Sequence, residues 1–299
     1  MLLCRLIVSV FVAVVLTACL QTTTELPHSP IPEQASVHHG KERFEHLSKM
    51  QVIDQMMAES GMDTMIDQVP AMVVMGLEQQ PAPPIARHEY NAFKQHLLDT
   101  FEPVRIRQIV VDYLDEHYES ERFIGLLQLL KNPLVKKMTQ LEVEANMPEA
   151  QQEMMQMANI IMGQVPPQRL DMIRKLDEAT RSTQASVDIQ MIMAKTMMTN
   201  MNKIVPQAQR MSEVQLAQSL EQMRMASIFP TRQYVELLMV YAYRSVSDEE
   251  LEKYLELYES ELGYWSTGLM LNAWMRVSEE VSFDLAQRMQ KTFIKHNML

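Results

Sequence analysis

From about Glu42 onward, apolar residues recur at steps of three and four positions, which is the spacing of one face of an amphipathic helix. Two runs show it best: Phe123, Leu126, Leu127 and Leu130, and Leu251, Tyr254, Leu255 and Tyr258. Only 7 of the 299 residues are glycine, and the alternation typical of strands is nearly absent. The sequence therefore predicts an all-α bundle of roughly ten helices.

Proline and serine residues predict where these helices begin. Proline fits the first turn of a helix but disrupts its interior, so most of the 14 prolines should lie at helix starts or in loops. Ser247-Asp248-Glu249-Glu250 has the spacing of a capping box, in which the serine and the third residue after it bond each other's backbone. A helix should start there.

The N-terminus has the pattern of an export signal. Arg5 precedes an apolar run from Leu6 to Leu16, which as a helix would span roughly 16 Å, against roughly 30 Å for a membrane core. Leu16, Thr17 and Ala18 then precede Cys19, and this stretch resembles the bacterial lipobox. The resemblance implies cleavage before Cys19 and acylation of that cysteine. Two or more acyl chains would then anchor the protein stably in a membrane.

This signal predicts the location and the attachment of the mature protein. Leu20 follows the cysteine, which by resemblance to enteric lipoproteins favours the periplasmic face of the outer membrane of a Gram-negative bacterium. Cys4 leaves with the signal, so Cys19 is the only mature cysteine, and neither an intramolecular disulfide nor a catalytic thiol is expected.

We expect four segments: a signal peptide at 1–18, an acylated, disordered tether at 19–40, and two tandem, diverged helical repeats at 41–165 and 166–299. Threonines make the tether polar and prolines make it partly extended, so it cannot pack by itself. The repeats are indicated by a shift of 128 positions, which places Phe123 on Leu251, Leu127 on Leu255 and Tyr113 on Tyr241. A unit of this length has the size of a domain.

Two stretches at the same shift carry a family resemblance: Leu129-Leu130-Lys131-Asn132-Pro133-Leu134-Val135, and Leu257-Tyr258-Glu259-Ser260-Glu261-Leu262-Gly263. An apolar helix that ends in an aromatic residue and continues as Ser-Pro-x-Gly is similar to domain-of-unknown-function family 2059. The first stretch keeps only the proline, whereas the second keeps the aromatic, serine and glycine. The resemblance would cover about 45–145 and 170–295. It implies a helical fold and export, and no activity.

Methionine is unusually frequent, with 28 residues against 8 phenylalanines. The densest cluster comprises Met191, Met193, Met197, Met198 and Met201. Three interpretations stay open: helix core, a plastic apolar surface that binds a protein or lipid, and a thioether site for Cu(I).

No sequence motif indicates catalysis or a cofactor. The zinc-protease helix, the nucleophile elbow, the phosphate-binding loop and the dinucleotide fingerprint are absent. Glu142 and Glu144 are interpreted as solvated carboxylates on a helix face. Without residues 1–18 the chain has 26 basic against 38 acidic side chains, which disfavours nucleic acid as a partner.

We therefore expect a non-enzymatic envelope lipoprotein that needs no cofactor or metal. Its partners would be the membrane, through the lipid anchor, and an envelope protein or lipid held on Met-rich apolar surface. The alternatives are a periplasmic Cu(I)-binding protein and a hydrolase with a dispersed site.

Overall fold

The computed structural model describes residues 46–78 and 87–297, and the expected signal, Cys19 and tether lie outside these ranges. The described residues form an all-α fold without strands, as predicted. In chain order the helices are α3 (Lys49–Glu59), α4 (Met62–Glu78), α5 (Arg87–Thr100), α6 (Pro103–Glu116), α7 (Ser120–Leu130), α8 (Pro133–Ala145), α9 (Pro148–Gln164), α10 (Pro167–Thr180), α11 (Ser182–Ile204), the short 3-10 helix η1 (Gln207–Gln209), α12 (Glu213–Ala242), α13 (Asp248–Glu259) and α14 (Glu261–Asn297).

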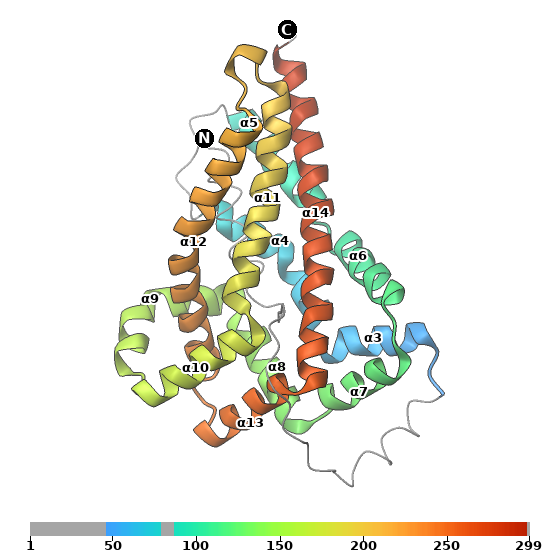
Figure 1. The fold of residues 1–299 in the computed structure, drawn as a ribbon, viewed down its shortest axis with the longest axis vertical. Helices are drawn as coiled ribbons and strands as arrows, with labels where there is room; N and C mark the ends of the chain where they lie inside the picture. The colour runs from blue at the N-terminus through green and yellow to red at the C-terminus, as the bar shows by residue number, and fades with distance from the viewer. Residues whose placement is uncertain (1–45, 79–86, 298–299) are drawn as a thin grey trace.

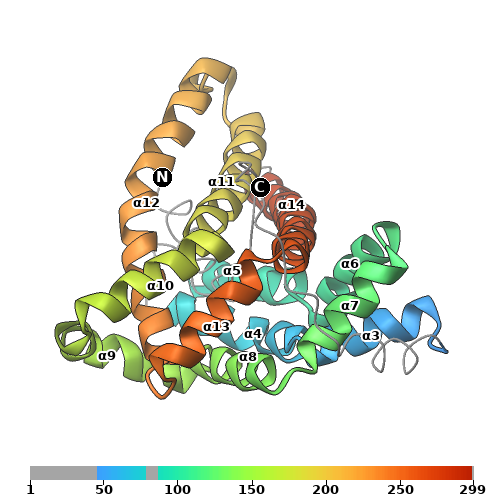
Figure 2. The same ribbon diagram turned by 60° about the horizontal axis from the view of Figure 1, so that its bottom comes forward.

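Three long helices form one side of the molecule. Helix α11 contacts both α12 and α14, and the three helices run side by side in Figure 1. The shorter helices α3, α7, α8 and α13 gather at the end from which α14 starts (Figure 1). When that end is turned forward, α4 and α8 lie beneath the long helices (Figure 2). Among the described residues, no helix combines the length and apolarity that a membrane span requires.

The helix boundaries follow the local signals with two exceptions. Prolines occupy the first turn of α6, α8, α9 and α10, as expected. The capping box is also confirmed, because the Ser247 hydroxyl accepts from the Glu250 backbone N–H and the Glu250 carboxylate accepts from the Ser247 N–H, both at 3.2 Å. Pro70 and Pro230, however, lie inside α4 and α12.

Two helix pairs are joined through a residue in the left-handed region. Gly61 (φ 75°) separates α3 from α4, and Arg181 (φ 50°) separates α10 from α11. The buried Asp177 carboxylate stabilises the second junction, because it accepts hydrogen bonds from the Thr183 backbone N–H (2.8 Å) and hydroxyl (2.6 Å) at the start of α11. A side chain from the preceding helix thereby supplies the cap that Arg181 does not.

The apolar spacing found in the sequence marks the core. Phe123, Leu127 and Leu251 are fully buried, and Leu126, Leu130, Tyr254 and Leu255 are nearly so. Phe123 packs edge-on against Trp265 of α14, with ring centroids 5.6 Å apart. Helices α7 and α13 therefore bury the faces that their sequence predicted, and Tyr258 alone of the two runs is half-buried.

Candidate ligand cavity

The five methionines singled out in the sequence lie along α11. Met191, Met193 and Met197 are buried, with exposed fractions of 7%, 0% and 2%, whereas Met198 and Met201 are half-buried. Helix α11 packs between α12 and α14, so the first three methionines are core side chains and present no open groove. Cu(I) binding by this cluster stays a prediction. Among the described residues, no group of three His, Cys, Asp or Glu side chains is placed to hold a metal ion.

Apolar surface does occur on two other helices. Met155, Met157 and Ile160 on α9 and Met225 and Phe229 on α12 are each between 39% and 65% exposed. Met225 and Phe229 lie one helical turn apart. The exposed methionines are therefore not those of the densest cluster.

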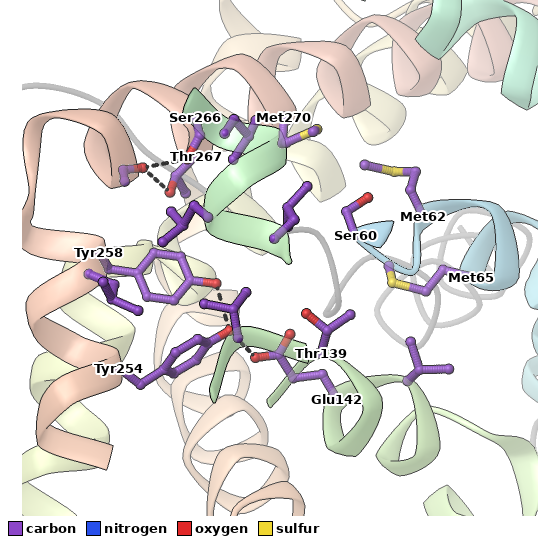
Figure 3. A pocket seen from close by; sticks show the side chains of 17 residues that line it. Ser60, Met62, Met65, Thr139, Glu142, Tyr254, Tyr258, Ser266, Thr267 and Met270 are labelled. Atoms are coloured by element: carbon purple, nitrogen blue, oxygen red, sulfur yellow. Dashed lines mark hydrogen bonds between the residues drawn. The ribbon is translucent and has the colours of Figure 1, made fainter. Parts of the chain in front are cut away.

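A cavity of about 100 Å³ lies where α13 and the start of α14 meet α4, α7 and α8 (Figure 3). Its lining is mostly apolar and includes no lysine, arginine or histidine. The lining residues are Ser60, Met62, Met65, Leu126, Leu129, Leu130, Val135, Thr139, Glu142, Val143, Tyr254, Leu257, Tyr258, Gly263, Ser266, Thr267 and Met270.

The polar centre of the cavity is the carboxyl group of Glu142. Its Oε1 atom accepts hydrogen bonds from the hydroxyls of Tyr243 (2.6 Å) and Tyr254 (2.8 Å). The Tyr254 and Tyr258 hydroxyls are 3.0 Å apart, and because Tyr254 gives its proton to Glu142, Tyr258 donates to Tyr254. The two bonds to the carboxyl group therefore both end on Oε1. The other oxygen of Glu142 lies on the side of the cavity near Thr139 (Figure 3).

The surroundings of Glu142 disfavour its negative charge. Part of the residue stays accessible through the cavity, yet burial has the largest effect and raises the pKa of the carboxyl above its ordinary value of 4.5. The hydrogen bonds from Tyr243 and Tyr254 lower the pKa in part. Within residues 46–78 and 87–297, Glu142 forms no salt bridge that would offset the loss of hydration. A buried carboxyl without a cationic partner favours its neutral form.

The interpretation of Glu142 as a solvated residue was therefore wrong, although Glu144 is exposed as expected. The sequence did contain a signal. Val135, Met138 and Ala145 are buried on α8, and Glu142 shares their three- and four-residue spacing, so it belongs to the apolar face. A lone acid within an apolar stripe is the feature that would have identified this residue.

Glu142→Gln is expected to remove part of the pH dependence of stability. The folded protein raises the pKa of Glu142, so its favourable contribution is complete below about pH 4.5 and is lost as pH rises through the folded-state pKa. The free energy of unfolding of the wild type should therefore fall relative to that of E142Q as pH rises above about 4.5, by on the order of 1 kcal/mol.

Urea denaturation of both proteins at several pH values measures this difference. The pKa of Asp177 is also raised by burial, but that group is present in both proteins and cancels. Glu144→Gln is the matched control, because it alters an exposed glutamate on the same helix. Parallel pH profiles for wild type and E142Q would contradict the assignment.

The chain matches no family model, no curated protein and no solved structure. The resemblance to domain-of-unknown-function family 2059 thus stays an expectation drawn from the two short stretches around Asn132 and Ser260.

Proposed function

We propose that this chain is a non-enzymatic, lipid-tethered binding protein of the bacterial cell envelope, and that the Glu142 cavity is its ligand site. The observation that carries the proposal is a mostly apolar cavity between helices far apart in the sequence, with one concentrated polar group that would orient a ligand. Small-molecule sites have this composition. The lipobox at Cys19 supports the location and the tether.

We also infer that the body consists of two copies of one helical unit. Helices α7 and α13 begin at residues 120 and 248, and α8 and α14 begin at residues 133 and 261, so both pairs differ by the 128 positions found in the sequence. At this shift α14 spans the positions of both α8 and α9.

Contacts between the two units support the same inference because they are reciprocal. The Arg122 guanidinium of α7 lies over the ring of Trp265 in α14, 5.5 Å from its centroid. The ammonium of Lys137 in α8 bonds the Glu250 carboxylate of α13 at 2.7 Å. Adding 128 to Arg122 gives Glu250, and adding 128 to Lys137 gives Trp265. Exchanging the units therefore turns one contact into the other, which is the signature of an approximate twofold axis.

The cavity lies at this axis. Twelve of its lining residues form six pairs at the 128-position shift: Leu126 and Tyr254, Leu129 and Leu257, Leu130 and Tyr258, Val135 and Gly263, Thr139 and Thr267, and Glu142 and Met270. In three of these pairs one residue is apolar and the residue 128 positions away is polar. Glu142, Tyr254 and Tyr258 thus have apolar counterparts at this shift, so the cavity has a direction that two identical units would not give it.

Methyl NMR of protein labelled at the methionine methyl groups tests whether the cavity takes a ligand. On titration with n-butanol, Met62, Met65 and Met270 should show saturable shifts because they line the cavity. The exposed Met50 and Met225 should not respond. Leu257→Phe, which fills part of the cavity, should abolish the response. Equal shifts at all methionines, or none at the lining ones, would refute the site.

A second candidate is docking of an envelope protein on apolar surface, which the exposed side chains of α9 and α12 favour. The Met225→Lys/Phe229→Lys double variant should then lose a cross-linked partner that the wild type retains in the envelope. Both side chains are 65% exposed, so the variant should fold normally.

A further inference from the structure

The head group that the cavity selects follows from the charge of its walls. No basic side chain is among its lining residues, and its one acid, Glu142, is bonded by neutral tyrosine hydroxyls. A ligand with a negative charge would meet no cationic side chain there, and the Glu142 carboxylate would repel it. A ligand with a positive charge would instead supply the partner that the buried carboxyl lacks among the described residues, and such pairing favours the ionised form.

The aromatic side chains next to Glu142 favour the same charge. The Tyr254 and Tyr258 rings lie edge to face, with centroids 5.0 Å apart and an angle of 86° between their planes. Both line the cavity beside the carboxyl group (Figure 3). An ammonium held within about 6 Å of such a ring is attracted by its π-electrons, and the attraction increases when water is excluded.

The size and the far wall of the cavity limit the rest of the ligand. An engineered apolar cavity of about 150 Å³ holds one benzene molecule of six heavy atoms. At about 100 Å³, this cavity has room for roughly four or five heavy atoms. Met62 and Met65 lie across from the tyrosines (Figure 3), and the Ser60 hydroxyl beside them donates to the Met57 carbonyl oxygen at 3.2 Å. The far wall is therefore mostly apolar and suits a short hydrocarbon chain.

We propose that the cavity binds a short primary alkylammonium, with the ammonium on the free oxygen of Glu142 and the alkyl chain directed toward Met62 and Met65. This inference rests on the proposed function, because it requires that the cavity accept a ligand. It adds the chemical class of that ligand and its orientation.

The test compares three probes of similar size on the mature chain: n-butylammonium, n-butanol and n-butyrate, at constant ionic strength. Shifts of the Met65 and Met270 methyl groups report binding. We expect n-butylammonium to bind at least tenfold more tightly than n-butanol, and n-butyrate to give no saturable shift. Binding of n-butanol or n-butyrate as tight as that of n-butylammonium would overturn the proposal.

Two variants separate a specific contact from the general negative charge of the protein. Glu142→Gln keeps the shape of the side chain and should weaken n-butylammonium binding tenfold or more, while n-butanol affinity changes by less than about threefold. Glu144→Gln removes the same charge from an exposed site on α8 and should leave both affinities unchanged. Equal loss of n-butylammonium binding in the two variants would overturn the proposal.

Failure of the alkylammonium proposal and failure of the proposed ligand site give different results. Saturable n-butanol binding without a preference for n-butylammonium would leave the cavity as a ligand site and reject the alkylammonium class. If no probe shifts the lining methionines, the proposed function itself fails. The comparison of the three probes on the wild-type protein shows which head group is preferred, even if a variant does not fold.

Discussion

Gly263→Ala is expected to destabilise the protein by about 3 kcal/mol or more, because the added methyl group would meet backbone atoms. A Cβ at this position would lie 2.0 Å from the Leu257 carbonyl oxygen and 2.8 Å from the Tyr258 Cα. A backbone clash cannot be relieved by a side-chain rotation. The turn from α13 to α14 would have to open, and the cavity wall formed by Tyr258 and Thr267 would move with it.

The turn explains why glycine is required here. One residue, Ser260, separates α13 from α14, whereas Lys131 and Asn132 separate α7 from α8. The shorter connection brings the two helices closer together. Val135, which lies 128 positions earlier on α8, can therefore carry a side chain that position 263 cannot.

Chemical denaturation measures the effect of Gly263→Ala. Gly163→Ala is the matched control, since a Cβ built there has no atom within 4 Å apart from its chain neighbours and the backbone of its own helix. That change in α9 should stabilise the protein by up to about 1 kcal/mol, because alanine loses less backbone entropy than glycine. If G263A unfolds within about 0.5 kcal/mol of the wild type, the close approach of α13 and α14 is wrong.

Cys19→Ser should abolish stable anchoring of the protein in the membrane. Serine offers no sulfur for the diacylglycerol, so the acyl chains that anchor a lipoprotein would not be attached. We expect the wild type from its native host to carry these chains on a polypeptide that begins at residue 19. The variant should keep residues 1–18 and lack the acyl mass.

Intact-mass analysis together with palmitate labelling reads out both effects. Cys4→Ser is the matched control, because it removes the other cysteine of the chain, which lies within the proposed signal. It should be labelled and processed like the wild type. An unmodified Cys19 thiol in the wild type, or a start elsewhere, would exclude the lipid anchor while leaving the helical fold unaffected.

The helical fold was predictable because its signals are local. Ser247 and Glu250 bond each other within one turn, and Leu251 and Leu255 lie on one face through the geometry of a single helix. These features need no knowledge of the rest of the chain. Pro230 shows where local rules fail: it lies on an exposed part of α12, where water can bond the backbone carbonyl that its missing N–H leaves free.

The candidate site was only partly predictable. Two of the helices that line the cavity, α7 and α13, carry the apolar runs that stood out in the sequence, but Glu142 was placed on a solvated face. Its environment depends on Tyr243 and Tyr254, which lie 101 and 112 positions away. Similarly, Met193 and Met225 each end a Met-x-Met pair, yet Met193 is buried on α11, which packs between α12 and α14, and Met225 is exposed.

The sequence by itself determined that this chain is helical, where α6, α8, α9, α10 and α13 begin, and which face of α7 and of α13 is buried. Those properties arise from hydrogen bonds and side-chain spacing within a few residues. Only the tertiary structure decided which helices enclose the cavity, that Glu142 faces it without a cationic partner among the described residues, and why position 263 must be glycine. These depend on distances between residues far apart in the chain, and the packing of whole helices sets such distances.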